Sequence, residues 1–176
     1  LNFLAYFVLN KSGDTNLQAS FAIYLTIRLM LYWSFIVSLI TKMAATASQA
    51  FGQSRDMSAG KKYFTQAFLL YFSYIAAVYL PFICLSRMML PWLGISREIS
   101  HPYQEIALKL LPAEVLDIVR SLIMEYCFSQ RVEAQFALVS WISVGIAALS
   151  TIFLTFTCNL GFDGYIIGRT ISSILN

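Results

Sequence analysis

The chain has 176 residues, of which 59% are hydrophobic and 12% are charged, and its formal net charge is +3. A soluble domain carries about 25% charged residues, so this chain has too few polar groups to cover a globule in water. The positive charge is small and spread out, which argues against nucleic acid as a partner. The composition therefore predicts an all-α fold, a polytopic bundle of transmembrane helices in a lipid bilayer.

Apolar segments follow one another along the chain. The first is the tail of a helix that ends near Asn10. Four more are expected at about residues 17–47, 63–86, 103–129 and 134–160, and a sixth begins at about residue 164. At about 20 residues per span, the length allows at most five or six helices. Because both end segments are too short to span, we expect the sequence to be a fragment of a longer chain.

Short polar stretches separate these segments. Turn formers occupy residues 11–16, and a polar, glycine-containing loop is expected at 49–62. Pro81 is expected to kink or end the third segment. Residues 87–102 contain Gly94 and two prolines, so they are predicted to be a connector. Short loops between long helices imply antiparallel neighbours.

The fourth segment differs from the others because charged residues run along it: Glu105, Lys109, Glu114, Asp117, Arg120 and Glu125. Its apolar residues still recur at helical spacing. We therefore expect an amphipathic helix that lies inside a bundle or forms the wall of a wet cavity, rather than facing lipid.

Glu114 and Asp117 are three residues apart and share one face of this helix. Two carboxylates that face one wet cavity repel each other, which suits proton or cation exchange. The alternative is an ion-paired stripe that faces water or another helix, and Asp117 is placed to pair with Arg120. Pro112 leaves a backbone carbonyl without its helical N–H partner, either beside an ion-binding site or as a simple kink.

Residues 44–53, AATASQAFGQ, carry a more specific signal than hydropathy. They resemble the end of the second helix in the MATE family, the multidrug and toxic compound extrusion transporters. Other pieces follow in the family's order: GDTNLQASFA at 13–22, GKKYFTQAF at 60–68, LPWLGISREIS at 90–100, Pro112, QRVEAQ at 130–135 and LGFDG at 160–164. The resemblance extends from residue 13 to residue 168, which is less than half of a transporter of this family.

The resemblance implies the N-terminal lobe, an incomplete set of six helices, of a twelve-helix secondary transporter whose C-terminal lobe is absent here. It implies antiport, in which small organic cations and drugs are exported in exchange for protons or sodium ions by alternating access. Gln49 either lines the substrate path or caps the helix end. Arg28 departs from the pattern, because an arginine is unusual at a lipid-embedded position. It either snorkels or pairs, or the protein has drifted from transport.

No motif of the sequence indicates an enzyme. There is one histidine, His101, and there is no GxSxG motif and no P-loop. The cysteines Cys84, Cys127 and Cys158 form no CxxC pair, so neither a metal site nor another cofactor is expected.

Two alternatives to the antiporter stay open. One is a non-transporting membrane scaffold subunit or a degenerate paralogue that keeps the helical fold. The other is a flippase for lipid-linked precursors from the same broad superfamily. The positive-inside rule leans towards placing the loop around Arg55 in the cytoplasm, with the protein in the plasma membrane or an endomembrane.

Overall fold

The computed structural model describes residues 2–54, 57–129, 134–158 and 160–175, and over these ranges the chain is helical without strands. The α-helices are α1 (Asn2–Ser12), α2 (Thr15–Ile27), α3 (Ser34–Ser54), α4 (Lys61–Tyr74), α5 (Leu80–Trp92), α6 (Arg97–Ser129), α7 (Ala134–Ile152) and α8 (Gly161–Leu175). Three π-helical turns are η1 (Arg28–Trp33), η3 (Ile75–Tyr79) and η4 (Phe153–Thr157), and η2 (Met57–Gly60) is a 3₁₀ turn. The predicted all-α class is confirmed.

Two long helices dominate the fold. The segment from α2 through η1 to α3 is one helix of 40 residues, and α4 through η3 to α5 is one of 32 residues. At 1.5 Å per residue they are about 60 Å and 48 Å long, whereas the hydrocarbon core of a bilayer is about 30 Å thick. Both are long and apolar enough to cross a membrane.

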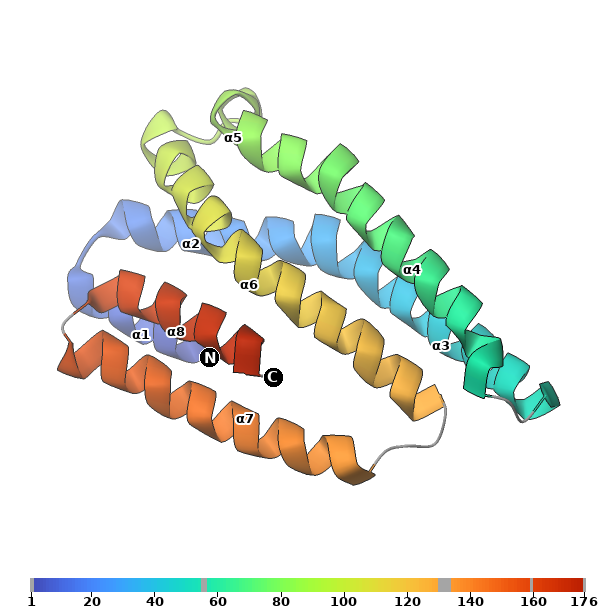
Figure 1. The fold of residues 1–176 in the computed structure, drawn as a ribbon. Helices are drawn as coiled ribbons and strands as arrows, with labels where there is room; N and C mark the ends of the chain where they lie inside the picture. The colour runs from blue at the N-terminus through green and yellow to red at the C-terminus, as the bar shows by residue number, and fades with distance from the viewer. Residues whose placement is uncertain (1, 55–56, 130–133, 159, 176) are drawn as a thin grey trace.

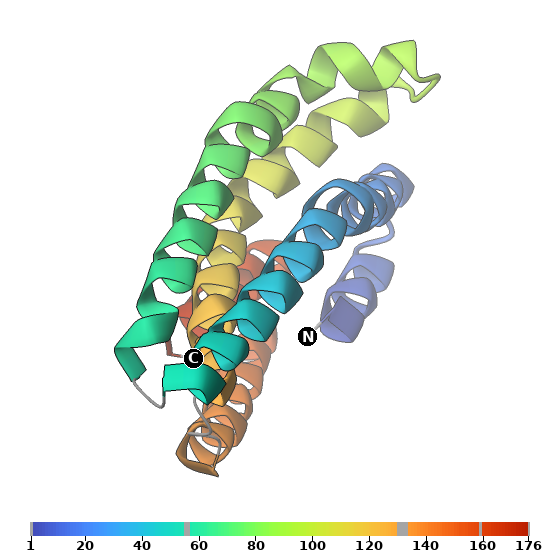
Figure 2. The same cartoon turned by 90° about the vertical axis from the view of Figure 1, so that its right-hand side faces the viewer.

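The central helix is α6, which packs against α2, α3, α4, α5 and α8 (Figure 1). Seen from the side, α6 runs between the α2–α3 helix and the α4–α5 helix (Figure 2). The last helices form a hairpin in which α7 packs on α8, and α8 in turn packs on α6. This central place agrees with the prediction that the charged helix lies inside a bundle, since five elements cover it.

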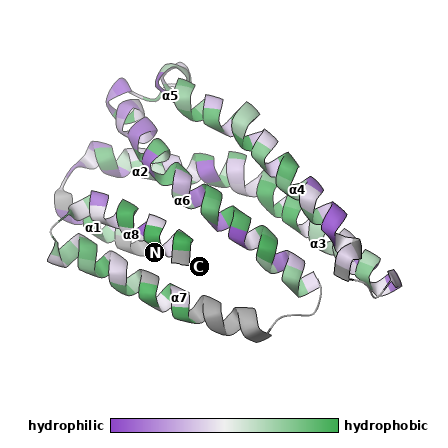
Figure 3. Ribbon diagram, in the orientation of Figure 1, coloured by the Kyte–Doolittle hydropathy of each residue, from purple (hydrophilic) through white to green (hydrophobic). Residues whose placement is uncertain are grey.

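The outer surface of the bundle is apolar. Hydrophobic residues dominate the later turns of α7 and much of the helix from α4 to α5, whereas hydrophilic ones gather where α6 begins (Figure 3). Large apolar side chains are exposed by more than half, among them Leu29 at 65%, Met88 at 66% and Leu149 at 69%. Apolar exposure on this scale is unfavourable in water and favourable against lipid tails.

The loop predicted at 49–62 is wrong in extent. Helix α3 continues to Ser54, and α4 begins at Lys61 after the η2 turn. The extension, QAFGQS at 49–54, contains no proline, and Ala50 and Phe51 are half-buried, so nothing in it stops the helix before the η2 turn. Gly52 is exposed and lies in open space, and one glycine costs a helix only about 1 kcal/mol.

The connector predicted at 87–102 is also wrong in extent, because only residues 93–96 separate α5 from α6. Gly94 ends α5 with a φ of +85°, which places it in the left-handed region. The amide of Ile95 donates to the Leu90 carbonyl at 3.1 Å, and the amide of Gly94 donates to the Pro91 carbonyl at 3.1 Å. This cap stops the helix within one turn, so Arg97 can begin the next.

Pro81 does not end the third segment. It lies in the first turn of α5, directly after the π turn η3, where the Leu80 amide donates to the Ile75 carbonyl. Pro81 lies inside the continuous helix from α4 to α5, and its missing N–H coincides with the change from π to α hydrogen bonding at the end of η3.

The turn predicted at 11–16 is shorter in the structure. Asp14 caps α2, since its Oδ1 accepts hydrogen bonds from the amides of Asn16 at 3.0 Å and Leu17 at 3.1 Å. Gly13 precedes it with a φ of +70°, a conformation that favours glycine. The remaining differences are earlier helix starts at Arg97 and Gly161 and an end of the fifth segment at Thr157. Arg55 lies outside the described residues.

Candidate functional site

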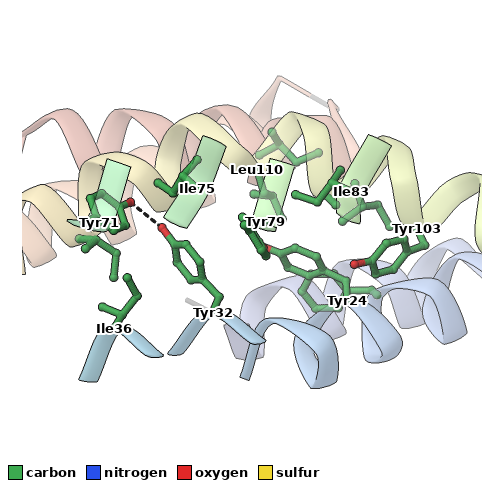
Figure 4. Packing of buried hydrophobic residues seen from close by; sticks show 14 of the residues in the cluster. Tyr24, Tyr32, Ile36, Tyr71, Ile75, Tyr79, Ile83, Tyr103 and Leu110 are labelled. Atoms are coloured by element: carbon green, nitrogen blue, oxygen red, sulfur yellow. Dashed lines mark hydrogen bonds between the residues drawn. The ribbon is translucent and has the colours of Figure 1, made fainter. Parts of the chain in front are cut away.

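On each of the two long helices, a regular spacing places polar side chains on the face that forms the site. Tyr24, Arg28 and Tyr32 are four residues apart and therefore lie on one face of the helix that joins α2 to α3. Tyr71 and Tyr79 are eight residues apart on the helix that joins α4 to α5, which again places them on one face. Figure 4 shows the tyrosine rings from both helices meeting in the layer between them.

Glu114 on α6 is the acidic centre of this layer, and only 3% of the residue is exposed. Its Oε1 forms an ion pair with Nε of Arg28 and accepts a hydrogen bond from the Tyr24 hydroxyl. Its Oε2 accepts a hydrogen bond from the Tyr79 hydroxyl at 3.2 Å. A buried carboxylate must be paired and hydrogen-bonded, and here three side chains from the two long helices satisfy both requirements.

The backbone of α6 next to Glu114 is also held by tyrosines. The Tyr32 hydroxyl donates to the Glu114 carbonyl at 3.0 Å and lies 2.7 Å from the Tyr71 hydroxyl. The rings of Tyr32 and Tyr79 stack with their centroids 4.5 Å apart. Two residues before Glu114, Pro112 interrupts the N–H series of α6 and is itself exposed. Two π turns, η1 and η3, thus supply residues to one point on a proline-containing helix, and π turns often occur at functional sites.

Asp117 faces a different helix. It forms an ion pair with Arg169 of α8, and its Oδ1 accepts a hydrogen bond from the Ser173 hydroxyl at 2.8 Å. The side chains of Arg169 and Asp117 are 21% and 18% exposed, so this pair is less buried than Glu114.

The predicted pairing of Asp117 with Arg120 is therefore wrong. Neighbours on one helix face are easily predicted, but Arg169 approaches from α8 and takes the carboxylate instead. Glu114 and Asp117 each pair with their own arginine, and their action in one wet cavity stays a prediction. The alternative, an ion-paired stripe that faces other helices, agrees with the structure. Arg120 is half-buried on α6.

The free space at this centre is small. A cavity of about 10 Å³ has room for about one water molecule. It is lined by Tyr24, Leu25, Arg28, Leu110, Ala113, Glu114, Tyr165 and Arg169. A larger cation can reach Glu114 only if helices move apart.

Gln49 lies apart from this centre. It is exposed near the C-terminal end of α3, so the structure does not bring it to Glu114 and Asp117. Tyr24, Tyr79 and Arg169 are site residues that sequence reasoning missed. The spacing of Tyr24 and Arg28 on one helix face is the signal that could have identified the first of them.

Known proteins give no further assignment. A scan of family models and searches of curated proteins and of solved structures found no match to the chain. The resemblance to the MATE family stays a prediction based on the segments quoted above. In the part of the chain that the structure describes, no group of three or more His, Cys, Asp or Glu side chains is arranged to hold a metal ion.

Proposed function

We propose that this chain is one six-helix lobe of a twelve-helix secondary antiporter of the MATE type, inserted in a membrane as a multi-pass protein. It exports small organic cations in exchange for protons or sodium ions. Support comes from the two long apolar helices, from the apolar outer surface and from the order of the MATE-like segments.

The observation that carries the proposal is the buried Glu114 centre. A charged group inside a membrane bundle is costly, so it marks an ion or substrate pathway by default. Glu114 is bound by side chains from both long helices, through Tyr24 and Arg28 on one and Tyr79 on the other. A change in the charge of this single carboxylate therefore acts on two helices at once.

The mechanism assigned to Glu114 is that of the coupling carboxylate. When a proton binds, the charge that attracts Arg28 disappears, and one carboxyl oxygen turns from a hydrogen-bond acceptor into a donor. The tyrosine hydroxyls that donate to it must then rotate or leave. The state in which these helices meet tightly at α6 is thereby disfavoured, and the population shifts to an arrangement open to the other side.

Arg28 acts as an internal cation in this scheme. It occupies the position next to Glu114 that a sodium ion or an organic cation would take, and its guanidinium carbon lies 5.6 Å from the ring centroid of Trp33. A cation–π contact of this kind also stabilises the Arg28 guanidinium when it moves away from Glu114. Substrate and Arg28 then compete for one carboxylate, which gives exchange rather than simple leakage.

The alternative is a non-transporting scaffold that keeps the helical fold. It is favoured by the pairing of both Glu114 and Asp117 with arginines and by a central cavity with room for about one water. In this case the ion pairs fix the arrangement of the helices and nothing passes between them.

Transport measurements on the protein expressed from its complete coding sequence separate these two functions. The purified protein is reconstituted into vesicles with an imposed proton gradient, an imposed sodium gradient or neither, and ethidium movement is recorded. The antiporter requires ethidium movement that depends on one gradient and stops when that gradient is collapsed. The scaffold function requires none, from protein shown to be folded by its circular dichroism.

A further inference from the structure

A second opening lies between the middle of α3 and the C-terminal end of α6, and these two helices run side by side (Figure 1). Its volume is about 430 Å³, within the range of about 300–1,000 Å³ that is usual for small-molecule sites. It is lined by Ile40, Thr41, Ala44, Ala45, Ser48, Glu125, Phe128 and Ser129. We call this opening the α3–α6 groove. Small side chains on α3 leave the space, and α6 supplies the charge.

Glu125 is the acidic side chain among the described residues that line this groove, and it is half-buried. The carboxylates of Glu114, Asp117 and Asp163 each form an ion pair with a basic side chain. The side chain of Glu125 forms no ion pair or hydrogen bond with any residue that the structure describes. A carboxylate that is partly removed from water without a partner loses solvation energy, and a ligand with a positive charge restores it.

Phe128 lies three residues after Glu125, on the same face of α6, and lines the same groove. The face of an aromatic ring attracts cations, and its body packs against apolar groups. Among the residues that the structure describes, no lysine and no arginine line the groove, so none of these residues competes for the charge of Glu125. The chemistry of the groove thus fits an organic cation, a single positive charge on an apolar or aromatic body.

Glu125 lies eleven residues after Glu114 on α6, which is about 16 Å along the helix axis. Half the thickness of a hydrocarbon core is about 15 Å. If Glu114 lies at the middle of the membrane, the α3–α6 groove opens at the membrane surface. The same end of the bundle carries Lys61 and Lys62 at the start of α4, the side that the positive-inside rule leans towards placing in the cytoplasm.

We infer that the α3–α6 groove is a binding site for an organic cation, with Glu125 as its counter-ion and Phe128 as its aromatic contact. It is distinct from the Glu114 centre. Its role as the place where a cation is taken up before transport rests on the proposed function, whereas binding itself does not.

Binding of tetraphenylphosphonium to the purified full-length protein in nanodiscs tests the inference by calorimetry. Glu125→Gln is expected to weaken binding about tenfold or more, because the ion pair is lost while the size of the side chain is kept. Glu98→Gln is the matched control, since it removes the same charge from an exposed position in the first turn of α6 and is expected to leave the affinity unchanged. Phe128→Leu keeps an apolar side chain without the ring and is expected to weaken binding several-fold.

Uncharged triphenylphosphine oxide separates charge from bulk. Its affinity should be insensitive to Glu125→Gln if Glu125 acts as a counter-ion. The inference is overturned if Glu125→Gln and Glu98→Gln bind tetraphenylphosphonium equally well, or if Glu125→Gln weakens both ligands alike.

A quaternary ammonium lipid headgroup carries the same chemistry, so the nanodiscs are made with either phosphatidylcholine or phosphatidylglycerol. If tetraphenylphosphonium binds more weakly in phosphatidylcholine and Glu125→Gln abolishes this difference between the lipids, the cation site is supported and the headgroup is identified as an occupant. Equal affinity in both lipids supports a soluble cation. Loss of binding in Glu125→Gln from a protein that transports nothing leaves the groove established and rejects the transporter. Gradient-driven transport by a protein whose tetraphenylphosphonium affinity is unchanged by Glu125→Gln rejects the groove and supports the transporter.

Discussion

Helix α6 forms two ion pairs whose surroundings differ. One joins Glu114, in the middle of the helix, to Arg28, and the other joins Lys109, five residues earlier, to Asp163. The side chains of Arg28 and Glu114 are 11% and 4% exposed, whereas those of Lys109 and Asp163 are 47% and 63% exposed. The inner pair adds hydrogen bonds from Tyr24 and Tyr79 to the carboxylate. The outer pair is a single contact of 2.8 Å between Lys109 Nζ and Asp163 Oδ1.

This difference shows where charge matters in the molecule. An exposed pair adds little to stability, since water and salt screen it and both long side chains lose freedom. A buried pair also adds little over an apolar pair of the same shape, but the loss of one partner leaves a charge in a place without solvent. The Glu114 centre is therefore sensitive to any event that neutralises one side, as an ion-coupled switch requires.

The largest effect is expected from Glu114→Ala. It leaves Arg28 buried without its counter-ion and two tyrosine hydroxyls without their acceptor, which should lower the free energy of unfolding by about 3–5 kcal/mol. Unfolding of the purified protein in mixed detergent micelles with increasing dodecyl sulfate measures it. The double variant Arg28→Met, Glu114→Met removes both charges and should recover most of the loss. A double variant as unstable as Glu114→Ala would mean that lost packing, not the unpaired charge, causes the loss of stability.

A smaller loss is expected from Asp117→Asn. The amide keeps a hydrogen-bond acceptor for Ser173 but no longer neutralises Arg169, and this pair is about one-fifth exposed. Partial contact with solvent limits the loss to about 1–3 kcal/mol. The same unfolding measurement applies, and Arg169→Gln should give a loss of similar size. A loss as large as that of Glu114→Ala would contradict the ranking by burial.

The smallest effect is expected from Lys109→Met. Because the pair with Asp163 is largely exposed, its removal should change the free energy of unfolding by about 1 kcal/mol or less. Repeating the measurement at high salt should leave this variant and the unaltered protein closer together. A change above 2 kcal/mol would show that the exposed pair of Lys109 and Asp163 contributes more to the free energy of unfolding than its exposure indicates.

The sequence predicted the class of the fold and the order of the helices, because long apolar segments and turn formers are local signals. The place of α6 inside the bundle followed from its run of charges, which lipid would not accept. Helix ends were harder to predict. The prolines at 81, 91 and 102 suggested breaks, yet all three lie within helices, and the Gly94 cap confines the real break to four residues, 93–96.

The candidate site was predicted in part. Glu114 and Asp117 stood out as carboxylates in an apolar chain, but their partners come from residues far away in sequence. No local rule connects Asp117 with Arg169, so the nearer Arg120 was chosen. Buried tyrosines are ambiguous for another reason, since a ring that packs and a hydroxyl that binds a carboxylate have the same sequence signature.

Glu114→Gln in a transport assay tests the central claim most directly, because it removes the coupling charge while it keeps the size of the side chain. The full-length protein is reconstituted into vesicles, and two activities are compared: uptake of ethidium driven by an ion gradient, and exchange of labelled for unlabelled ethidium without a gradient. If Glu114 couples transport, the variant loses gradient-driven uptake by about tenfold or more, and exchange falls as well because ethidium competes with Arg28 for this carboxylate. A folded variant with unchanged gradient-driven uptake would contradict the account.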